Sequence, residues 1–205
     1  MKKIFLLTII TITSLAVKAQ QDFKTAAASA RTAYAAGKLE DAHFSLQQAL
    51  QELDIIIGKE VIKLLPAKMD SLNTNAAEDG VTSTSGYLGT TIRRVYTTPS
   101  KNAELQIVSN SPLIGTLNAF LNTPLLAGLG SDGKTKVIKI AGYKGRLTKE
   151  DGYSEDATTP AQPSYKIEVP FSNALVTFTV TKSNEAEIVR LANTIPLAQI
   201  AKLIQ

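Results

Sequence analysis

The spacing of apolar residues predicts two helices at the start of the chain. From Asp22 onward, apolar side chains recur every three or four residues as far as Gly37, at positions 23, 26, 27, 30, 33 and 34. A second run with the same spacing extends from Leu39 to Leu64, where Gly58 permits a bend and Pro66 ends the run. Together they predict an antiparallel helical hairpin within residues 20–72.

The second helix carries a longer apolar stripe, from Leu46 to Leu64, than the first helix can cover. Each large apolar side chain left exposed forfeits roughly 1.5 to 3 kcal/mol of burial. We therefore expect the hairpin to dock on the rest of the chain, with the remaining part of the stripe covered there or by another protein.

Residues 73–85 are small, polar and without periodicity, which predicts a linker. Strand patterns follow it at 87–97, 104–108, 136–143, 146–149, 165–170 and 174–182. Helices are expected after Ser111 and Pro112, after Asn184 with Glu187 as a capping box, and from about Pro196. The predicted fold class is α+β: an N-terminal helical hairpin followed by an antiparallel sheet packed with helices over residues 86–205.

Residues 30–53 resemble the middle of a single tetratricopeptide repeat, at Tyr34, Gly37, Leu39, Ala42, Leu46, Ala49 and Leu50. The opening Trp and Leu-Gly positions of that repeat are not matched, and no second copy follows, whereas solenoids need about three repeats. One docked hairpin is therefore expected in place of a peptide-binding array. The element order of the chain is similar to the PsbP-like α/β/α sandwich, and its C-terminal half resembles uncharacterised exported proteins of Gram-negative bacteria.

Residues 1–19 have the three parts of a secretory signal peptide. Lys2 and Lys3 precede an apolar run over residues 4–16, and Val17 and Ala19 occupy the −3 and −1 positions of a cleavage site. The apolar run is shorter than the roughly 20 residues of a transmembrane helix. We expect cleavage before Gln20, a periplasmic or secreted mature chain, and no transmembrane segment after cleavage.

Composition removes several classes of function. Three of the 22 Lys and Arg residues lie in the signal, which leaves 19 basic and 18 acidic residues, too balanced for a general nucleic-acid binder. The chain has no cysteine, so neither a disulfide nor a lipidated cysteine is expected. With His43 as its one histidine, a zinc site and a Ser-His-Asp triad are both disfavoured. No cofactor fingerprint is present.

The string from Gly128 to Thr135 satisfies the phosphate-loop pattern of Gly, four residues, Gly-Lys-Thr. A working phosphate loop leads into a helix, whose N-terminus faces the phosphates. Here the following residues, 136–141, have a strand pattern, and Asp132-Gly133 is a turn pair. We therefore interpret the string as a turn and expect no nucleotide binding.

Two other groups of residues are candidate sites. Arg94, Lys139, Tyr143 and Arg146 are the predicted ligand-binding residues: if the basic ones share a sheet face, they could meet an anionic lipid or polysaccharide. Charged residues that alternate along the solvent face of a sheet, without binding a ligand, would give the same sequence pattern. Four carboxylates lie in one loop, at Glu150, Asp151, Glu155 and Asp156. They fit either the paired carboxylates of a hydrolase or a solvated loop, and the sequence leaves both interpretations open.

The leading hypothesis is a non-catalytic periplasmic or secreted protein with a binding or scaffolding role in the cell envelope. The alternative is a hydrolase of envelope polymers that uses the loop carboxylates, and a third hypothesis is a lipid carrier with a pocket between helix and sheet.

Overall fold

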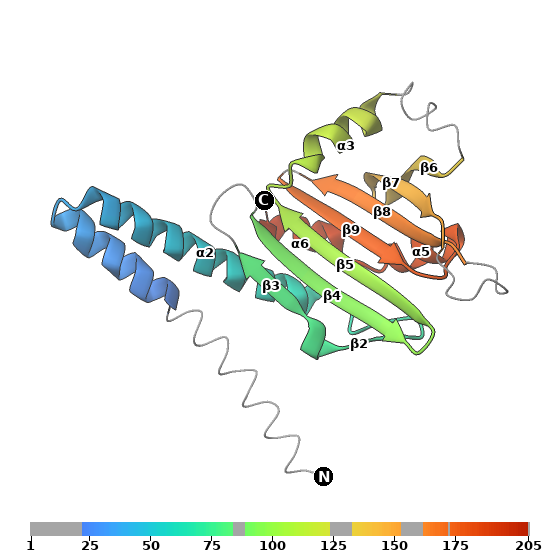
Figure 1. Cartoon of the computed structure of the whole chain (residues 1–205), viewed down its shortest axis with the longest axis horizontal. Helices are drawn as coiled ribbons and strands as arrows, with labels where there is room; N and C mark the ends of the chain where they lie inside the picture. Colours follow the sequence, from blue (N-terminus) through green and yellow to red (C-terminus); the bar gives the residue numbers. More distant parts are fainter. Residues whose placement is uncertain (1–21, 84–88, 124–132, 153–161, 172, 205) are drawn as a thin grey trace, which may run out of the picture.

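The computed structural model describes residues 22–83, 89–123, 133–152, 162–171 and 173–204. The predicted fold class is confirmed: a helical hairpin precedes a large antiparallel sheet with further helices, so the protein is α+β (Figure 1).

The hairpin consists of α1, described over residues 22–35, and α2 (Leu39–Leu64). Gly37 turns the chain between them with a φ of 73°, in the left-handed region that favours glycine. Small side chains are buried between the helices and let them approach closely: Ala26 and Ala30 on α1, Ala42 and Ala49 on α2. In Figure 1 the hairpin, coloured blue to cyan, projects beyond the sheet.

Nine strands form one sheet. Their bounds are β1 (Lys68–Met69), β2 (Leu72–Thr74), β3 (Gly80–Ser83), β4 (Thr90–Thr98), β5 (Lys101–Ser109), β6 (Thr135–Ile140), β7 (Tyr143–Glu150), β8 (Ser164–Phe171) and β9 (Ala174–Val180). The order is β1-β2-β4-β5-β9-β8-β7-β6, with β3 also paired to β4, and every pair is antiparallel. β9, the last strand in the chain, therefore lies in the middle of the sheet.

The expected linker at residues 73–85 is largely a wrong prediction. Up to Ser83 it contains the end of β2, the short 3-10 helix η1 (Ala76–Glu78) and β3. The two strands pair along β4, with Asn73 opposite Thr97 and Val81 opposite Ile92. These edge strands are three and four residues long, too short to show an alternating pattern among small polar side chains. Residues 84 and 85 lie outside the described residues.

Helices cover the two faces of the sheet unequally. On one face, the C-terminal half of α2, α5 (Glu185–Ala192) and α6 (Leu197–Ile204) close the main core, which includes Tyr96, Leu105, Ile167, Phe178, Ile188 and Ile200. On the other face, α3 (Leu113–Asn122) packs Leu117 and Leu121 against Leu175 of β9. The rest of this second face carries mainly polar side chains, with Val95 and Val108 as apolar exceptions, so the sheet largely alternates apolar and polar residues as a half-covered antiparallel sheet should.

Gly58 lies where α2 meets the sheet, and α2 continues through it without interruption. A Cβ atom at Gly58 would overlap Cγ1 of Val81 and approach Cγ1 of Ile92 to 3.3 Å. The glycine therefore serves close packing of α2 on β3 and β4, and the possible bend inferred from the sequence is not the reason for it.

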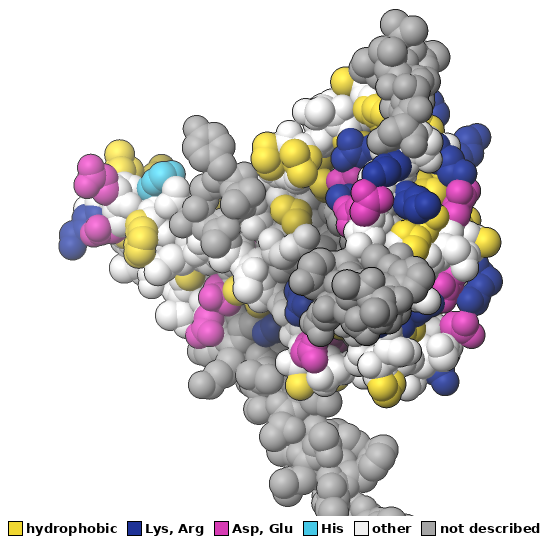
Figure 2. Space-filling model, turned by 45° about the vertical axis from the view of Figure 1, so that its right-hand side comes forward, with side chains coloured by type: hydrophobic (Ala, Val, Ile, Leu, Met, Phe, Trp, Pro, Cys, Tyr) yellow, Lys and Arg dark blue, Asp and Glu magenta, His cyan; other side chains and the backbone are white. Residues whose placement is uncertain are grey.

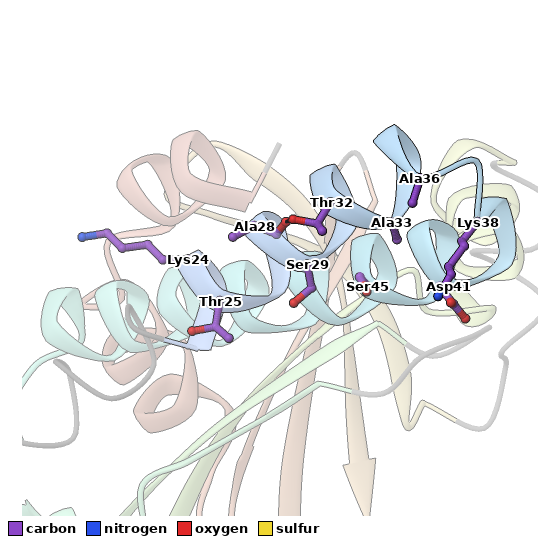
Figure 3. Close-up of a pocket in the computed structure, with 10 residues that line it drawn as sticks. All are labelled: Lys24, Thr25, Ala28, Ser29, Thr32, Ala33, Ala36, Lys38, Asp41 and Ser45. Carbon is purple, nitrogen blue, oxygen red and sulfur yellow. Dashed lines mark hydrogen bonds between the residues drawn. The ribbon is translucent and has the colours of Figure 1, made fainter.

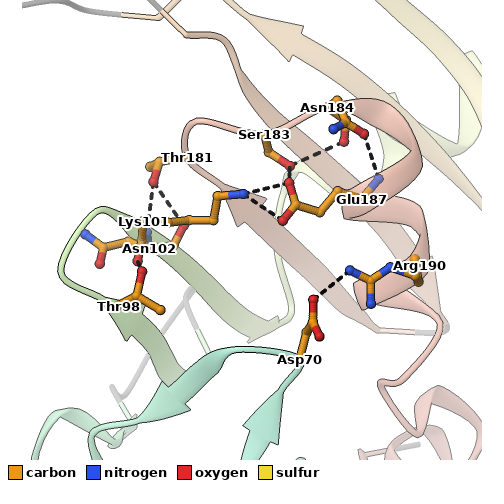
Figure 4. Close-up of polar contacts among 9 residues, drawn as sticks. All are labelled: Asp70, Thr98, Lys101, Asn102, Thr181, Ser183, Asn184, Glu187 and Arg190. Carbon is orange, nitrogen blue, oxygen red and sulfur yellow. Dashed lines mark hydrogen bonds and ion pairs between the residues drawn. The ribbon is translucent and has the colours of Figure 1, made fainter.

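The turn between β4 and β5 is tied to the start of α5 by polar contacts (Figure 4). Asn184 Oδ1 accepts a hydrogen bond from the Glu187 amide at 3.0 Å, as the capping pattern predicted. The Glu187 carboxylate, in contrast, accepts from Lys101 Nζ at 2.6 Å and from the Ser183 hydroxyl at 2.9 Å. Burial alone would raise the pKa of Glu187, but these hydrogen bonds outweigh it and hold the pKa below its usual value.

Candidate binding surfaces

The four predicted ligand-binding residues do not form one site. Arg94 and Tyr143 lie on the face of the sheet that holds the main core, whereas Lys139 and Arg146 lie on the opposite face. The condition that Arg94, Lys139 and Arg146 share a face is therefore not met.

Arg94 is a buried structural residue. Its Nε and Nη2 donate to the two carboxylate oxygens of Asp79 at 2.9 and 2.6 Å, and its Nη1 donates to the carbonyl oxygen of Leu65 at 3.0 Å. The hydrogen bond to Asp79 raises the pKa of the guanidinium. Beside it, burial raises the pKa of Tyr96 to about 12. Arg94 thus joins the end of α2, the segment before β3, and β4.

Tyr143 is half-buried at the start of β7. Its ring meets the ring of Phe171 edge to face, with centroids 5.5 Å apart at an angle of 61°. Such an arrangement is typical of packed aromatic pairs. Tyr143 therefore belongs to the margin of the core.

Arg146 and Lys139 remain on the second face. Arg146 forms an ion pair with the buried carboxylate of Glu168, at 2.7 Å from Nη2 to Oε2, and its guanidinium lies 5.7 Å from the ring centroid of Phe120. Lys139 stands directly opposite Lys144 in the β6–β7 ladder, and both are exposed. Neither lysine has an ion-pair partner among the described residues. Figure 2 shows Lys and Arg side chains gathered on this part of the molecule, with acidic side chains among them.

The phosphate-loop string leads into a strand, as the sequence predicted. Gly133 has a φ of 67°, and Thr135 begins β6, so no helix follows the lysine. Lys134 Nζ instead pairs with Asp151 Oδ2 at 2.6 Å. Residues 128–132 lie outside the described residues.

The loop carboxylates that the structure describes are each paired with a lysine. Glu150 pairs with Lys166 at 2.6 Å, and the hydrogen bond from Lys134 lowers the pKa of Asp151. Glu155 and Asp156 lie outside the described residues. Within the described ranges, no three His, Asp or Glu side chains are placed to hold a metal ion.

A groove of about 690 Å³ runs along one side of the hairpin (Figure 3). Small and hydroxyl-bearing side chains line it, among them Ala28, Ser29 and Thr32 of α1 and Ser45 of α2. The Thr32 hydroxyl is already bonded to the carbonyl oxygen of Ala28 at 3.0 Å. The groove offers neither an aromatic anchor nor a buried charge.

A second groove, of about 340 Å³, lies on the polar face over β5 and β9. Its lining consists of amide, carboxylate and hydroxyl side chains: Asn102, Glu104, Gln106, Thr177, Thr179 and Thr181. Glu104 pairs with Arg93, and the Thr181 hydroxyl donates to the carbonyl oxygen of Asn102. Asn102, Glu104 and Thr181 thus already have partners within the fold.

Exposed apolar side chains are concentrated on the projecting hairpin. Four leucines of α2, which we call the leucine row, are 65, 53, 61 and 37 % exposed, respectively, at Leu39, Leu46, Leu50 and Leu53. Tyr34 of α1 is 72 % exposed, and Phe44, elsewhere on α2, is 60 % exposed. The sequence indicated that the part of the α2 stripe beyond the first helix would lack a partner within the hairpin, and that part, at Val61 and Leu64, packs on the main core. The leucines that stay exposed lie instead in the part of α2 alongside α1.

No family model and no curated protein matches the chain. A solved structure, a crystal structure from Bacteroides thetaiotaomicron VPI-5482, is similar to it with a TM-score of 0.34 and 12 % identity. The similarity covers 62 % of this chain and 44 % of that one.

Proposed function

We propose that the chain is a non-catalytic protein of the periplasm or the extracellular space, with a binding or scaffolding role in the cell envelope. Export is supported by the charge, apolar run and small residues of residues 1–19. Among the described residues no helix is long and apolar enough to cross a membrane.

The observation that carries the binding role is the leucine row. Large apolar side chains that stay more than half exposed on a projecting element are typical of protein interaction surfaces. The remainder of α2 shows that the same helix can bury its apolar side chains where the fold provides a cover, as at Val61. Leu39, Leu46 and Leu50 have no such cover among the described residues.

The candidate catalytic groups support the non-catalytic part of the proposal. Lys134, Glu150 and Asp151 each form an ion pair that neutralises their charge. A general acid or base needs a pKa near the working pH, whereas the partner of Asp151 lowers its pKa further from neutrality.

The test is site-specific photocrosslinking in cells, with the photoreactive residue placed at Leu46 and, as matched control, at Phe44. Both side chains are more than half exposed on α2, but only Leu46 belongs to the leucine row. We expect a discrete crosslinked protein from position 46, weaker or absent crosslinking from position 44, and loss of the product on Leu50→Glu. The proposal fails if position 46 yields no discrete product.

The location is tested by sequencing the N-terminus of the protein in periplasmic and extracellular fractions. We expect Gln20 as the first residue. Intact Met1 on membrane-bound protein would contradict this.

Lys139 and Lys144 support a second candidate, an anion-binding patch for a lipid headgroup or an acidic polysaccharide. Two exposed like charges directly across a ladder destabilise it unless a counter-ion is present. The test is binding to phosphatidylglycerol and phosphatidylcholine vesicles by the Lys139→Glu/Lys144→Glu variant, with Lys68→Glu/Lys202→Glu as a control of equal net charge. Equal loss of binding in both variants would show only a general charge effect.

A further inference from the structure

The leucine row follows the spacing of a helix–helix seam. Leu39, Leu46 and Leu53 are seven residues apart, and Ala42 and Ala49 fall between them, so the positions alternate at intervals of three and four. This is the repeat that brings one helix against another along its length. The two alanines are buried against α1, whereas the leucines of the same repeat are exposed.

The complementary surface is on α1. Phe23, Ala27 and Tyr34 follow at intervals of four and seven residues on the side of α1 next to the leucine row, and Ala30 beside them is buried against α2. A leucine packs well opposite a small residue of the facing helix, because large and small side chains then interdigitate. The hairpin therefore presents an apolar side made by both helices, with Ala27 as its small position on α1.

Helix geometry places the seam on the side of the hairpin opposite the groove drawn in Figure 3. At about 100° per residue, the positions of Asp41 and Ser45 flank the α1-facing alanines of α2 on one side, and the leucine row flanks them on the other. Further along α2, Leu64 packs on the main core, where α2 meets α6. The apolar side of α2 is thus covered inside the protomer near Leu64 and exposed along the leucine row.

We infer that the leucine row is covered by the hairpin of a second copy of this chain, with α2 of each protomer over α1 of the other, in an antiparallel four-helix bundle. The inference rests on the proposed function and names its partner. A two-fold axis parallel to the helices generates this arrangement, in which the same surface serves both protomers.

Charge favours this arrangement over the one that stacks α1 on α1. Arg31 of α1 and Glu40 of α2 lie on the outer margins of the seam side and have no ion-pair partner among the described residues. Along the hairpin axis they are about one helical turn apart. With α2 over α1, Arg31 of one protomer approaches Glu40 of the other, whereas with α1 over α1 the two arginines would face each other.

The size of the face sets the expected strength. Two helices about 10 Å wide and about 15 residues long give a face of roughly 20 by 22 Å. This is smaller than the roughly 800 Å² that each partner buries in a standard interface, so a weak dimer is expected, with a dissociation constant in the micromolar range.

The first test is sedimentation of the mature chain, residues 20–205, from about 1 to about 200 µM, the range in which a small interface dissociates. We expect a concentration-dependent monomer–dimer equilibrium. Leu46→Glu/Leu50→Glu should raise the dissociation constant at least about tenfold, since it places four charges in the seam. Phe44→Glu, at an equally exposed position off the seam, should leave it unchanged, and circular dichroism should show both variants folded.

The second test uses the absence of cysteine in the chain. Ala27→Cys and Leu46→Cys chains are mixed and oxidised at the same concentrations. The proposed arrangement brings position 27 of one protomer opposite position 46 of the other, so mixed disulfide dimers should exceed either homodimer. A third measurement is charge exchange: Arg31→Glu should weaken the dimer, and adding Glu40→Arg should restore it.

A monomer at every concentration, a dimer that Leu46→Glu/Leu50→Glu leaves intact, or disulfides that join position 46 only to position 46 would each overturn the inference. If the chain is monomeric while photocrosslinking at Leu46 captures a different protein, the second copy is wrong and the proposed function stands. If that position captures nothing, both fail.

Discussion

Arg93 and Arg94 are neighbours on β4, and each forms a two-pronged ion pair with a carboxylate, but the two pairs differ in burial. The Arg94–Asp79 side chains are 10 and 14 % exposed, and the Arg93–Glu104 side chains are 42 and 41 % exposed. They therefore provide an internal comparison of the same chemistry on two sides of one strand. We predict that Asp79→Asn destabilises the protein strongly and that Glu104→Gln hardly does.

The magnitude follows from what each change leaves behind. Removing one partner of a buried pair costs about 3 to 5 kcal/mol, because a buried charge stays uncompensated. Asparagine can still accept one of the two hydrogen bonds, and Arg94 keeps its bond to the Leu65 carbonyl, so a loss of about 2 to 3 kcal/mol, at or just below the lower end of this range, is expected for Asp79→Asn. An exposed pair contributes about 0 to 1 kcal/mol.

Urea unfolding followed by circular dichroism measures the loss of stability in both variants. With a slope of about 2 kcal/mol per molar urea, Asp79→Asn should lower the midpoint by about 1 to 1.5 M and Glu104→Gln by less than about 0.5 M. Equal shifts for the two variants, at unchanged slope, would refute the assignment of Arg94 as the residue that ties α2 to the sheet.

Three further predictions concern other elements. Gly58→Ala should destabilise the protein by about 1 to 2 kcal/mol in urea unfolding, because the added Cβ overlaps Val81; Gly115→Ala, in α3 with nothing within 4 Å, should stabilise it by up to about 1 kcal/mol, and the same sign for both would contradict the packing. The lowered pKa of Glu187 adds stability that is present above about pH 4.5 and is lost as pH falls through the folded-state pKa, so unfolding free energy should fall less between about pH 6 and about pH 3 in Glu187→Gln than in the unaltered chain. Titration with Mg-ATP should show no binding, and micromolar affinity abolished by Lys134→Ala would contradict the role of residues 133–135 as a turn into β6.

The hairpin was the most predictable part of the fold. Its helices are set by local signals, a three-to-four-residue apolar spacing that ends at Gly37 and Pro66, and they run over 22–35 and Leu39–Leu64 as expected. The start of α5 at Asn184 was equally readable, because capping is a contact between residues three apart.

The order of the strands in the sheet could not be predicted from the sequence. Period-two alternation identifies strands but not their neighbours, and here β9 pairs with β5 across about 70 intervening residues while β8 takes its other edge. The short strands β2 and β3 have too few inward side chains to be distinguished from a loop, and their positions depend on pairing with β4.

The role of Arg94 had a signal in the sequence that was not used. Positions 92, 94 and 96 share one face of β4, and the first and last are Ile and Tyr. A charged residue in phase with two core residues is more consistent with a buried, paired group than with an exposed ligand contact. Lys139 and Arg146, out of phase with Ile138 and Leu147, were the two whose exposure the alternation supported.

The way α2 ends bears on how the hairpin can act. A linker after the hairpin would let it swing, so a partner bound at the tip would have no fixed relation to the sheet. Instead α2 is one 26-residue helix whose C-terminal half contributes Val61 to the core. Leu65, the residue that follows the helix, also lies in the core, and β1 begins within four residues of the end of α2. Arg94 closes this junction by bonding the Leu65 carbonyl and Asp79 at once. The leucine row is therefore held at a fixed distance and angle from the polar face of the sheet. A rigid arm of this kind suits a scaffold, because two bound molecules would be fixed relative to each other.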